Sequence, residues 1–338
     1  MTKLVIQIPV YNEAPYLPAV LAGLPRQLPG VESVQVVVID DGSIDDSAKV
    51  ALENGADFVL QHRKNQGLSR SFISGIRFAL ALGADIIVNT DGDNQYPGSE
   101  IGLLIEPILS GRADLVIGDR KTLENENFSP LKRQLESVGS WFVRRVSATN
   151  VPDTASGFRA FSRYAALPLE VFNPFSYTLE TLIQAGKSGM KIESVPVKTN
   201  PAQRASRLHK GLFDFIWHQG GAVIRSYMLY QPLRTFLSIG GVFFLAGAVL
   251  LLRFLIYFLF IGEASRYIQS VSIGGTLTLA GIILILIGFI GDAVRANREL
   301  SEEILVNMRD KNTVQPGPDL TEFEGLPVYS QEHPYPGL

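Results

Sequence analysis

The chain has 338 residues, of which 46% are hydrophobic, and it carries a formal net charge of −3. Nucleic-acid binders usually have a strongly basic domain or stripe, so this charge argues against that class and against nucleic acid as a partner. The absence of cysteine excludes disulfides, thiolate metal ligands and a cysteine nucleophile. A mean hydropathy of +0.17 suggests that part of the chain lies outside water.

Residues 1 to about 200 alternate between short apolar runs and helical patterns. The runs, rich in β-branched residues, cover residues 4–8, 34–39, 58–60, 86–89 and 115–118. The helical patterns lie near residues 15–28, 45–54, 68–82 and 99–110. This alternation predicts an α/β, Rossmann-like fold with a mainly parallel sheet covered by helices. The first run follows no charged and then apolar leader, so we expect a strand there rather than a signal peptide.

Polar clusters follow three of the predicted strands. PVYNE follows the first strand, DDGS the second and DGDNQ the fourth. In parallel α/β sheets, ligands bind beyond the carboxyl ends of the strands. We therefore expect the three clusters to meet at one edge of the sheet.

The stretch NTDGDNQYP, residues 89–97, carries two carboxylates one residue apart, at Asp91 and Asp93. A polar turn is the plain alternative, but neighbouring carboxylates repel each other unless a cation or a hydrogen-bonding ligand compensates them. Together with the amide oxygen of Gln95 they form an all-oxygen set, which favours Mg²⁺ or Mn²⁺. The scarcity of histidine and the lack of cysteine argue against zinc.

Six motifs, in this order, resemble those of the family 2 glycosyltransferases of GT-A fold. They are IPVYNE at 8–13, VVVIDDGSIDD at 36–46, NQGLSRS at 65–71, NTDGDNQYP at 89–97, IGDR at 117–120 and DTASGFRAF at 153–161. More narrowly, they resemble the polyprenyl-phosphate glycosyltransferases, the dolichyl-phosphate mannose synthase group. The resemblance covers roughly residues 4–210 and implies a nucleotide sugar as donor and a polyprenyl phosphate as acceptor.

The resemblance also implies roles for individual residues. Asp91, Asp93 and Gln95 would place the metal on the donor diphosphate, and Arg120, counted with Asp91 and Asp93 as catalytic, would lie near the phosphates or the sugar. The expected contacts of the nucleotide sugar are Pro9, Tyr11, Glu13, Asp40 or Asp41, Asp91, Gly92 and Asp93.

Four further residues are implied to bind phosphates. The family's R-x-x-x-S corresponds to Arg133 and Ser137, which would bind the acceptor phosphate. Its later basic motif corresponds to RASRL, where Arg204 and Arg207 would grip the acceptor phosphate and the donor diphosphate. Here the sequence departs from the family pattern, because the usual stretch is longer and has a glycine before the serine.

The chemistry fits the residues present. A phosphate monoester has a second pKa of about 6, so a polyprenyl phosphate is largely a dianion and needs no strong general base. The histidines, His62, His209, His218 and His333, all lie outside the motifs. The departing diphosphate needs neutralisation, which a metal and arginines supply. In-line displacement would invert the anomeric centre.

Two long apolar stretches predict a membrane hairpin. Residues 235–262 carry only Arg253, and residues 267–291 carry no charge, so each exceeds the roughly 20 residues needed to cross a bilayer. Basic residues flank the pair at Lys210, Arg225, Arg234, Arg295 and Arg298, against Arg266 alone in the connection. The positive-inside rule then puts both termini and the catalytic part in the cytoplasm. Arg253 is expected to snorkel toward the connection, with a partner helix as the alternative.

The expected organisation has four parts. It comprises a glycosyltransferase domain at 1–210, an interfacial amphipathic helix at 211–232, a hairpin at 233–298 with spans at about 235–261 and 271–291, and a cytoplasmic tail at 299–338. Residues 130–148 could lie either in the headgroup layer or against the sheet. The stretch after about 312, rich in proline and glycine, is expected to be disordered or loosely draped.

Other interpretations stay open beside these. Asp45 and Asp46 are expected to cap the following helix. Gly67 could admit a diphosphate to a helix amide end or form a plain turn, and Asp153 could contact substrate or make a structural hydrogen bond. A processive polysaccharide synthase or a non-catalytic scaffold are the alternative functions. A UDP-sugar is favoured over GDP-mannose, the lipid is dolichyl or undecaprenyl phosphate, and the hairpin is compatible with a homo-oligomer.

Overall fold

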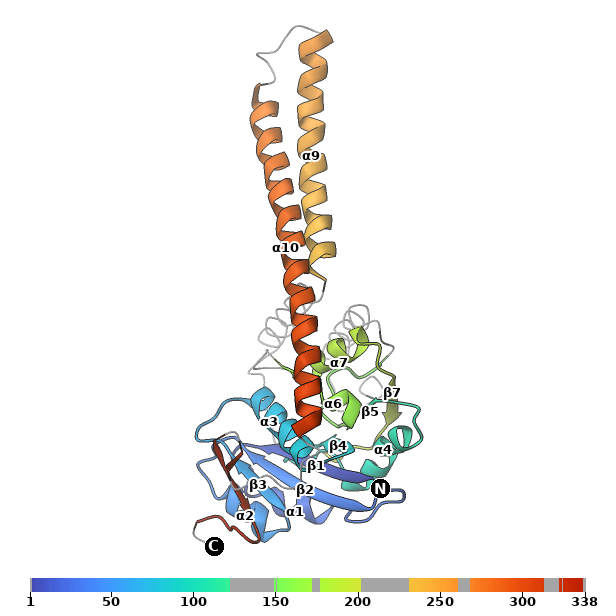
Figure 1. Cartoon of the computed structure of the whole chain (residues 1–338), viewed down its shortest axis with the longest axis vertical. Coiled ribbons are helices and arrows are strands. Elements are labelled where there is room, and N and C mark those ends of the chain that lie inside the picture. The colour runs from blue at the N-terminus through green and yellow to red at the C-terminus, as the bar shows by residue number, and fades with distance from the viewer. Residues whose placement is uncertain are drawn as a thin grey trace. The chain divides into compact units, whose positions relative to one another are not determined.

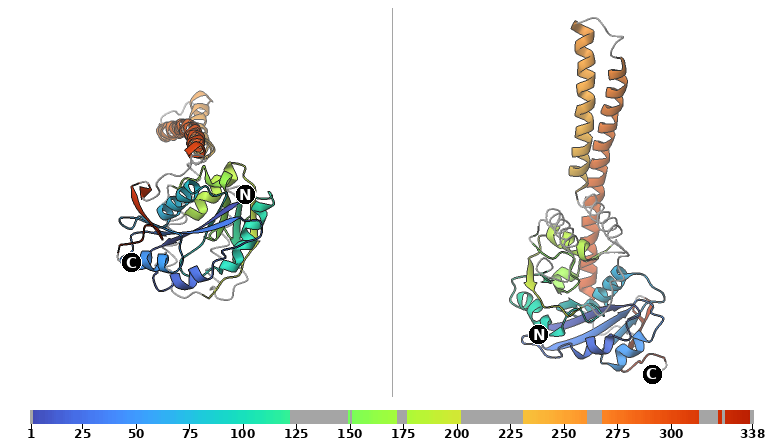
Figure 2. Two further views of the ribbon diagram at one scale, coloured as in Figure 1. Left: turned by 60° about the horizontal axis from the view of Figure 1, so that its bottom comes forward. Right: turned by 180° about the vertical axis from the view of Figure 1, so that it is seen from behind.

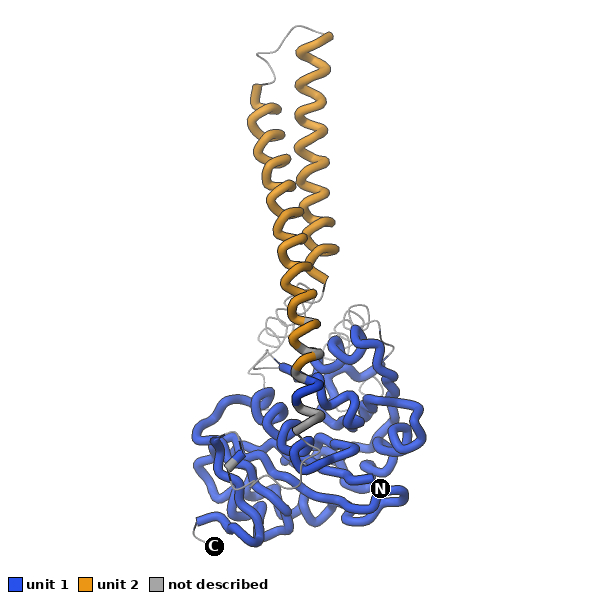
Figure 3. The backbone as a smooth tube through the Cα atoms, in the orientation of Figure 1, with its two compact units in different colours: residues 1–222, 305–338 blue, residues 223–304 orange. Residues whose placement is uncertain are grey.

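The computed structural model describes residues 2–121, 149, 151–171, 177–201, 231–260, 268–312, 322–323 and 325–336. The chain divides into two compact units, one of residues 1–222 with 305–338 and one of residues 223–304 (Figure 3). The predicted amphipathic segments 130–148 and 211–232 lie outside the described residues, apart from the last two positions of the second.

The first unit is built on a mixed sheet (Figure 1). Its strands are β1 (Lys3–Val10), β2 (Ser33–Asp40), β3 (Phe58–Gln61), β4 (Ile86–Asn89), β5 (Leu115–Asp119), β6 (Arg159–Ser162), β7 (Ile192–Pro196), β8 (Glu322–Phe323) and β9 (Leu326–Ser330). They are arranged in the order β7-β5-β6-β4-β1-β2-β3-β9-β8. The central strands β4, β1, β2 and β3 are parallel, whereas β6 and β9 run antiparallel to their neighbours. The predicted α/β fold, with its first five strands, is confirmed.

Helices cover both faces of this sheet (Figure 2). They are α1 (Leu17–Ala22), α2 (Ser47–Glu53), α3 (Leu68–Ala81), α4 (Ile101–Leu109) after the 3₁₀ turn η1 (Gly98–Glu100), α6 (Arg163–Ala166) and α7 (Tyr177–Lys187). Successive side chains of a strand point to opposite faces. Accordingly, Leu4, Ile6 and Ile8 of β1 share a core cluster with residues of α1, α2 and α4. Gln7, between them, lies against Gly75 of α3, where an added Cβ would clash with its Oε1.

The described part of the second unit contains α9 (Pro232–Phe260) and most of α10 (Ile268–Asn312). Both helices are long and apolar enough to cross a membrane, with mean hydropathies of 2.5 for α9 and 2.4 for residues 268–298 of α10. The two backbones approach closely at glycines. A Cβ on Gly281 would lie 2.7 Å from the carbonyl oxygen of Gly240, and one on Gly247 would lie 2.6 Å from that of Gly274. Small residues that let helix backbones meet are typical of packing in membranes, where apolar burial gives little drive.

The described residues near the end of the chain correct the expectation that the stretch after about residue 312 is disordered or loosely draped. Helix α10 continues to Asn312, and two later segments form β8 and β9. Strand β9 pairs antiparallel with β3, where Leu60 is opposite Val328 and Phe58 is opposite Ser330. An edge strand such as β3 exposes unpaired backbone groups, and β9 covers this edge. The sequence suggested disorder because turn residues surround the strand, whereas long-range pairing decides its structure.

Replacing Val328 with aspartate is expected to release β9 from the sheet. Val328 is 6% exposed, and an ionised carboxylate buried without a partner costs several kcal/mol. Limited proteolysis should therefore cut the tail of Val328→Asp faster than that of the wild type, and thermal unfolding should begin at a lower temperature. The exposed Glu332→Ala serves as the control in the same tail. Equal protection of β9 in Val328→Asp and in the wild type would contradict the assignment.

Candidate active site

The three polar clusters meet at one edge of the sheet, as the sequence predicted. Strands β4, β1 and β2 are adjacent and parallel, with Gln7 opposite Asn89 and Val10 opposite Asp40. The loops that follow these strands therefore leave the sheet at neighbouring positions.

The loop after β1 is hydrogen-bonded to the loop after β2. Asn12, in a left-handed conformation with φ of 56°, receives the amide of Ile44 on its Oδ1 at 2.9 Å and donates its own amide to Ser43 Oγ at 2.9 Å. The amide of Glu13 donates to Ser47 Oγ at 2.9 Å. Glu13 is buried, whereas Tyr11 is 38% exposed. These reciprocal bonds form a rigid frame around the predicted nucleotide loop.

The loop after β4 is folded tightly on itself and on its surroundings. Asp93 Oδ1 accepts the backbone amide of Gln95 at 3.1 Å, and Asn94 between them has a φ of 60°. Asn200 donates its amide to the Gln95 carbonyl and its side-chain Nδ2 to the Asn94 carbonyl, both at 2.9 Å. At Gly92 a Cβ would lie 2.8 Å from Val10 Cγ1, so this position has no room for a side chain.

The oxygen ligands at this loop fit a divalent cation that takes its remaining ligands from a bound substrate. In the part of the chain that the structure describes, no three His, Cys, Asp or Glu residues gather as a metal site. Asp91, Asp93 and Gln95 supply two carboxylates and an amide oxygen, and Mg²⁺ is typically held by one or two carboxylates plus substrate phosphates. Gly157 faces Asp91, since a Cβ there would lie 3.2 and 3.3 Å from its two carboxylate oxygens. Position 157 therefore has no room for a side chain, and the glycine lets the carboxylate of Asp91 pack against the backbone there.

Arg120 and Asp153 form a two-point ion pair beside this loop. Arg120 Nε donates to Asp153 Oδ2 at 2.7 Å, and its Nη2 donates to Oδ1 at 3.0 Å. The two side chains are 14% and 4% exposed. A bidentate pair of this kind fixes the plane of the guanidinium. Asp153 thus makes a structural hydrogen bond, and the role of Arg120 near the phosphates or the sugar stays a prediction.

Two buried tyrosines flank the acidic loop. Burial, the largest cause, raises the pKa of Tyr96 to about 12, with Arg120 opposing and Asp91 adding to the rise. Burial and the nearby Asp91 likewise raise the pKa of Tyr177 well above its ordinary value. Tyr96 stacks on Phe158 with ring centroids 4.8 Å apart, and Tyr177 stacks on Phe72 at 4.1 Å. Both phenols are neutral at physiological pH, so neither supplies a base.

A polar network in the core supports this side of the site. Gln7 Nε2 donates to Asn89 Oδ1 at 3.0 Å. The Nδ2 of Asn89 donates to the Gly157 carbonyl at 2.9 Å and to Tyr177 Oη at 3.0 Å. Asn89 thereby links the end of β4 to Gly157, the glycine that faces Asp91. Sequence reasoning missed this role because the pattern marks Asn89 only as the last residue of a strand.

Arg159 is the other important residue that sequence reasoning missed. Its side chain is completely buried and donates to the carbonyls of Thr154, Ser156 and Thr178 and to Thr181 Oγ1, at 2.7 to 2.9 Å. Burial lowers its pKa to about 10, so it stays protonated at neutral pH. The signal was an arginine inside the apolar strand SGFRAF, since buried arginine is rare without a specific partner set.

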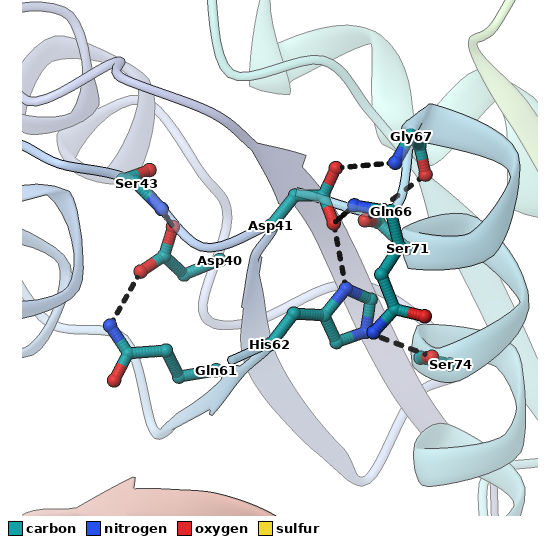
Figure 4. A network of polar contacts seen from close by, with 9 residues as sticks. All are labelled: Asp40, Asp41, Ser43, Gln61, His62, Gln66, Gly67, Ser71 and Ser74. Atoms are coloured by element: carbon teal, nitrogen blue, oxygen red, sulfur yellow. Dashed lines mark hydrogen bonds and ion pairs between the residues drawn. The ribbon is translucent and has the colours of Figure 1, made fainter. Parts of the chain in front are cut away.

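The two carboxylates of DDGS are both bound to protein groups. Asp40, which is fully buried, accepts the amide of Ser43 and the Nε2 of Gln61, each at 2.9 Å. Asp41 is 3% exposed and accepts the amides of Gln66 and Gly67, at 2.9 and 2.8 Å, at the start of α3 (Figure 4). A carboxylate of the chain itself therefore occupies the amide end at Gly67, and the turn is the observed alternative there.

The expected helix cap after DDGS is confirmed for one of its two aspartates. Asp45 Oδ1 accepts the amide of Ser47, the first residue of α2, at 3.1 Å. Asp46 occupies the N-cap position without a side-chain hydrogen bond to the helix. The predicted phosphate ligands Arg133, Ser137, Arg204 and Arg207 lie outside the described residues.

The fold of the first unit resembles that of a glycosyltransferase of known structure. The glucosyl-3-phosphoglycerate synthase of Mycobacterium tuberculosis, solved with Mn²⁺, UDP-glucose and phosphoglyceric acid, superposes with a TM-score of 0.51 at 20% identity. The superposition covers 67% of this chain and 79% of that one. At this identity the likeness shows the fold alone, which is of GT-A type.

Sequence comparison then gives the family. Residues 5–167 match the protein family described as "Glycosyl transferase family 2". A UDP-N-acetylglucosamine–dolichyl-phosphate N-acetylglucosaminyltransferase of Methanococcus voltae is 30% identical over 57% of this chain and 83% of its own. An undecaprenyl-phosphate mannosyltransferase of Micrococcus luteus is 28% identical over 56% and 80%, respectively. The chain belongs to glycosyltransferase family 2.

Proposed function

We propose that this glycosyltransferase moves a sugar from a nucleotide sugar to a polyprenyl phosphate, with inversion and with the help of a divalent metal. The product would be a polyprenyl-phosphate-linked monosaccharide. The observation that carries the proposal is the convergence of the loops after β4, β1 and β2, with Asp91 and Asp93 at the same edge as PVYNE. The acceptor named for the relatives in Methanococcus voltae and Micrococcus luteus supports the lipid phosphate.

The proposed roles follow from this arrangement. Pro9, Tyr11 and Glu13 would line the nucleoside part of the donor, on the frame that Asn12 forms with the DDGS turn. Asp91, Gly92 and Asp93 would bind the diphosphate side, and Asp91, Asp93 and Gln95 would hold Mg²⁺ or Mn²⁺. That ion, when bound, neutralises charge on the leaving diphosphate. The Mn²⁺ and UDP-glucose in the Mycobacterium tuberculosis structure support a metal in this fold.

The arginines complete the proposed chemistry. Asp153 holds the guanidinium of Arg120 in one plane beside the acidic loop, where its charge would stabilise the phosphates in the transition state. Arg133, Ser137, Arg204 and Arg207 remain the predicted ligands of the acceptor phosphate and the donor diphosphate. The acceptor dianion attacks without a general base, which agrees with two flanking tyrosines that stay neutral.

A hairpin in the cytoplasmic membrane is supported by the chain's own connectivity. Strand β9 follows α10 in the sequence and pairs with β3, which precedes α9. Two strands of one sheet lie on the same side of any membrane, so the helices between them would cross it an even number of times. The basic flanks would then place the domain at 1–210, the interfacial segment at 211–232 and the tail at 299–338 in the cytoplasm, around a hairpin at 233–298.

The proposal is tested by offering the purified full chain UDP-glucose, UDP-N-acetylglucosamine and GDP-mannose with a short polyprenyl phosphate and Mg²⁺ or Mn²⁺. We expect one sugar per lipid, with the anomeric configuration inverted, from a UDP-sugar, and loss of transfer in EDTA. Polymer formation would favour a processive synthase, and no transfer from any donor would favour a scaffold. Either result would overturn the proposed function.

A further inference from the structure

A buried histidine connects three elements next to the predicted nucleotide loops. His62 directly follows β3, and its side chain is completely buried. Its Nδ1 lies 2.7 Å from Asp41 Oδ1, and its Nε2 lies 3.1 Å from Ser74 Oγ of α3 (Figure 4). The imidazole therefore joins the DDGS turn, the end of β3 and the middle of α3.

The carboxylate of Asp41 fixes the orientation of this ring. An ionised carboxylate only accepts hydrogen bonds, so Nδ1 carries the proton that it donates to Asp41. The same carboxylate accepts the amides of Gln66 and Gly67. Removing the imidazole donor would leave a buried carboxylate with fewer bonds and free to shift, and the two amides would shift with it.

The segment that these amides belong to, residues 63–67, packs directly on the DDGS turn. Gly42 has a φ of 70°, and a Cβ there would lie 2.6 Å from the carbonyl carbon of Lys64. The backbone of this loop is therefore held from two sides, by Asp41 at Gln66 and Gly67 and by Gly42 at Lys64. The side chain of Lys64 is exposed, so the anchored loop presents a cation beside the DDGS turn, whereas Arg63 Nη2 donates to the carbonyl of Gly325 at 3.4 Å.

We propose that His62 is a positioning residue of the donor site, which acts through Asp41 to hold loop 63–67 against the DDGS turn. The loop then sets the affinity for the nucleoside diphosphate part of the donor, an anion that benefits from nearby positive charge. This inference rests on the proposed function, because it assumes a nucleotide at the ends of β1 and β2. It also gives Asp41 the role of an anchor rather than that of a nucleotide ligand.

Matched variants of His62 test the inference in the full chain. In His62→Asn the amide nitrogen takes roughly the place of Nδ1 and keeps a donor for Asp41. In His62→Gln it takes roughly the place of Nε2, and His62→Phe has no donor. We expect His62→Gln and His62→Phe to weaken binding of UDP or GDP and to raise the KM for the donor about tenfold, the factor that corresponds to losing one hydrogen bond to a charged group. His62→Asn should stay close to the wild type.

Two further readouts separate positioning from general damage. The acceptor KM and kcat should change little, and hydrogen exchange at the amides of residues 63–71 should accelerate in the variants that lose affinity. His333→Phe, in the exposed turn after β9, is the control. If His62→Phe fails to fold, the comparison of nucleotide affinity between His62→Asn and His62→Gln still tests the inference.

Unchanged nucleotide affinity in His62→Gln, with or without faster exchange, overturns the inference. A wild-type chain that binds neither UDP nor GDP overturns the proposed function and the inference with it. Exchange measurements without nucleotide then still report whether His62 anchors the loop, so the two failures are distinguishable.

Discussion

Replacing Asp93 with asparagine is expected to lower sugar transfer by at least about 100-fold, the usual effect of removing one preorganised electrostatic group from an active site. Asparagine retains an oxygen that can accept the amide of Gln95, as Asp93 does at 3.1 Å, so the loop should keep its shape. It loses the negative charge that would hold a divalent cation. Asp93→Ala removes both and should abolish transfer while leaving membrane insertion intact.

The measurement is transfer of a radiolabelled sugar into a lipid extract, together with the thermal shift that Mn²⁺ and UDP cause. A ligand that binds only the folded state raises the melting temperature, so the wild type should be stabilised by the pair and Asp93→Asn much less. The matched control is Asp46→Asn, an exposed aspartate whose side chain makes no bond to the helix it precedes. Full turnover by Asp93→Asn would contradict the assignment of Asp93 as a metal ligand.

Replacing Arg159 with methionine is expected to destabilise the first unit by about 3–5 kcal/mol. Methionine fills a similar volume but donates nothing, so the carbonyls of Thr154, Ser156 and Thr178 lose a donor, and each buried orphan costs ~1–3 kcal/mol. The melting temperature should fall by on the order of 10 °C. Because Arg159 ties the loop that carries Gly157 to the start of α7, residual folded protein should also transfer sugar more slowly.

Circular dichroism during heating of the full chain in detergent measures this effect. Arg112→Met is the matched control, because Arg112 forms ion pairs with Glu106 and Glu193 in which the partners are 38% to 58% exposed, and such pairs contribute little. Arg159→Lys separates charge from geometry. Lysine keeps the charge but not the planar fork, so we expect it to recover only part of the loss. Melting of Arg159→Met at the temperature of Arg112→Met would refute the structural role.

Local patterns were sufficient for the central sheet and the two long helices. The apolar runs at 4–8, 34–39 and 86–89 became β1, β2 and β4. Short, nearly continuous apolar runs between turn residues are typical of strands that are buried on both faces of a parallel sheet. The long apolar stretches near 235–261 and 271–291 became parts of α9 and α10, since length and apolarity are local properties.

Contacts between distant residues could not be read in the same way. The partner of Arg120 is Asp153, and that of Asp41 is His62, and nothing in the local pattern distinguishes these pairs from other polar residues in loops. The expectation of a disordered tail failed for the same reason. Strand β9 is short and lies among turn residues, and it is ordered only because β3 offers it a free edge.

Periodicity, segment length and the direction of parallel strands were enough to predict the fold class, the two candidate spans and the sheet edge at which the polar clusters gather. The partners of each carboxylate, by contrast, came from the three-dimensional structure alone. Asp40 and Asp41 are contacted by backbone amides, a glutamine and a histidine, whereas the carboxylate of Asp91 packs against Gly157. Hydrogen-bond satisfaction is a property of three-dimensional neighbours, and a linear motif does not specify them.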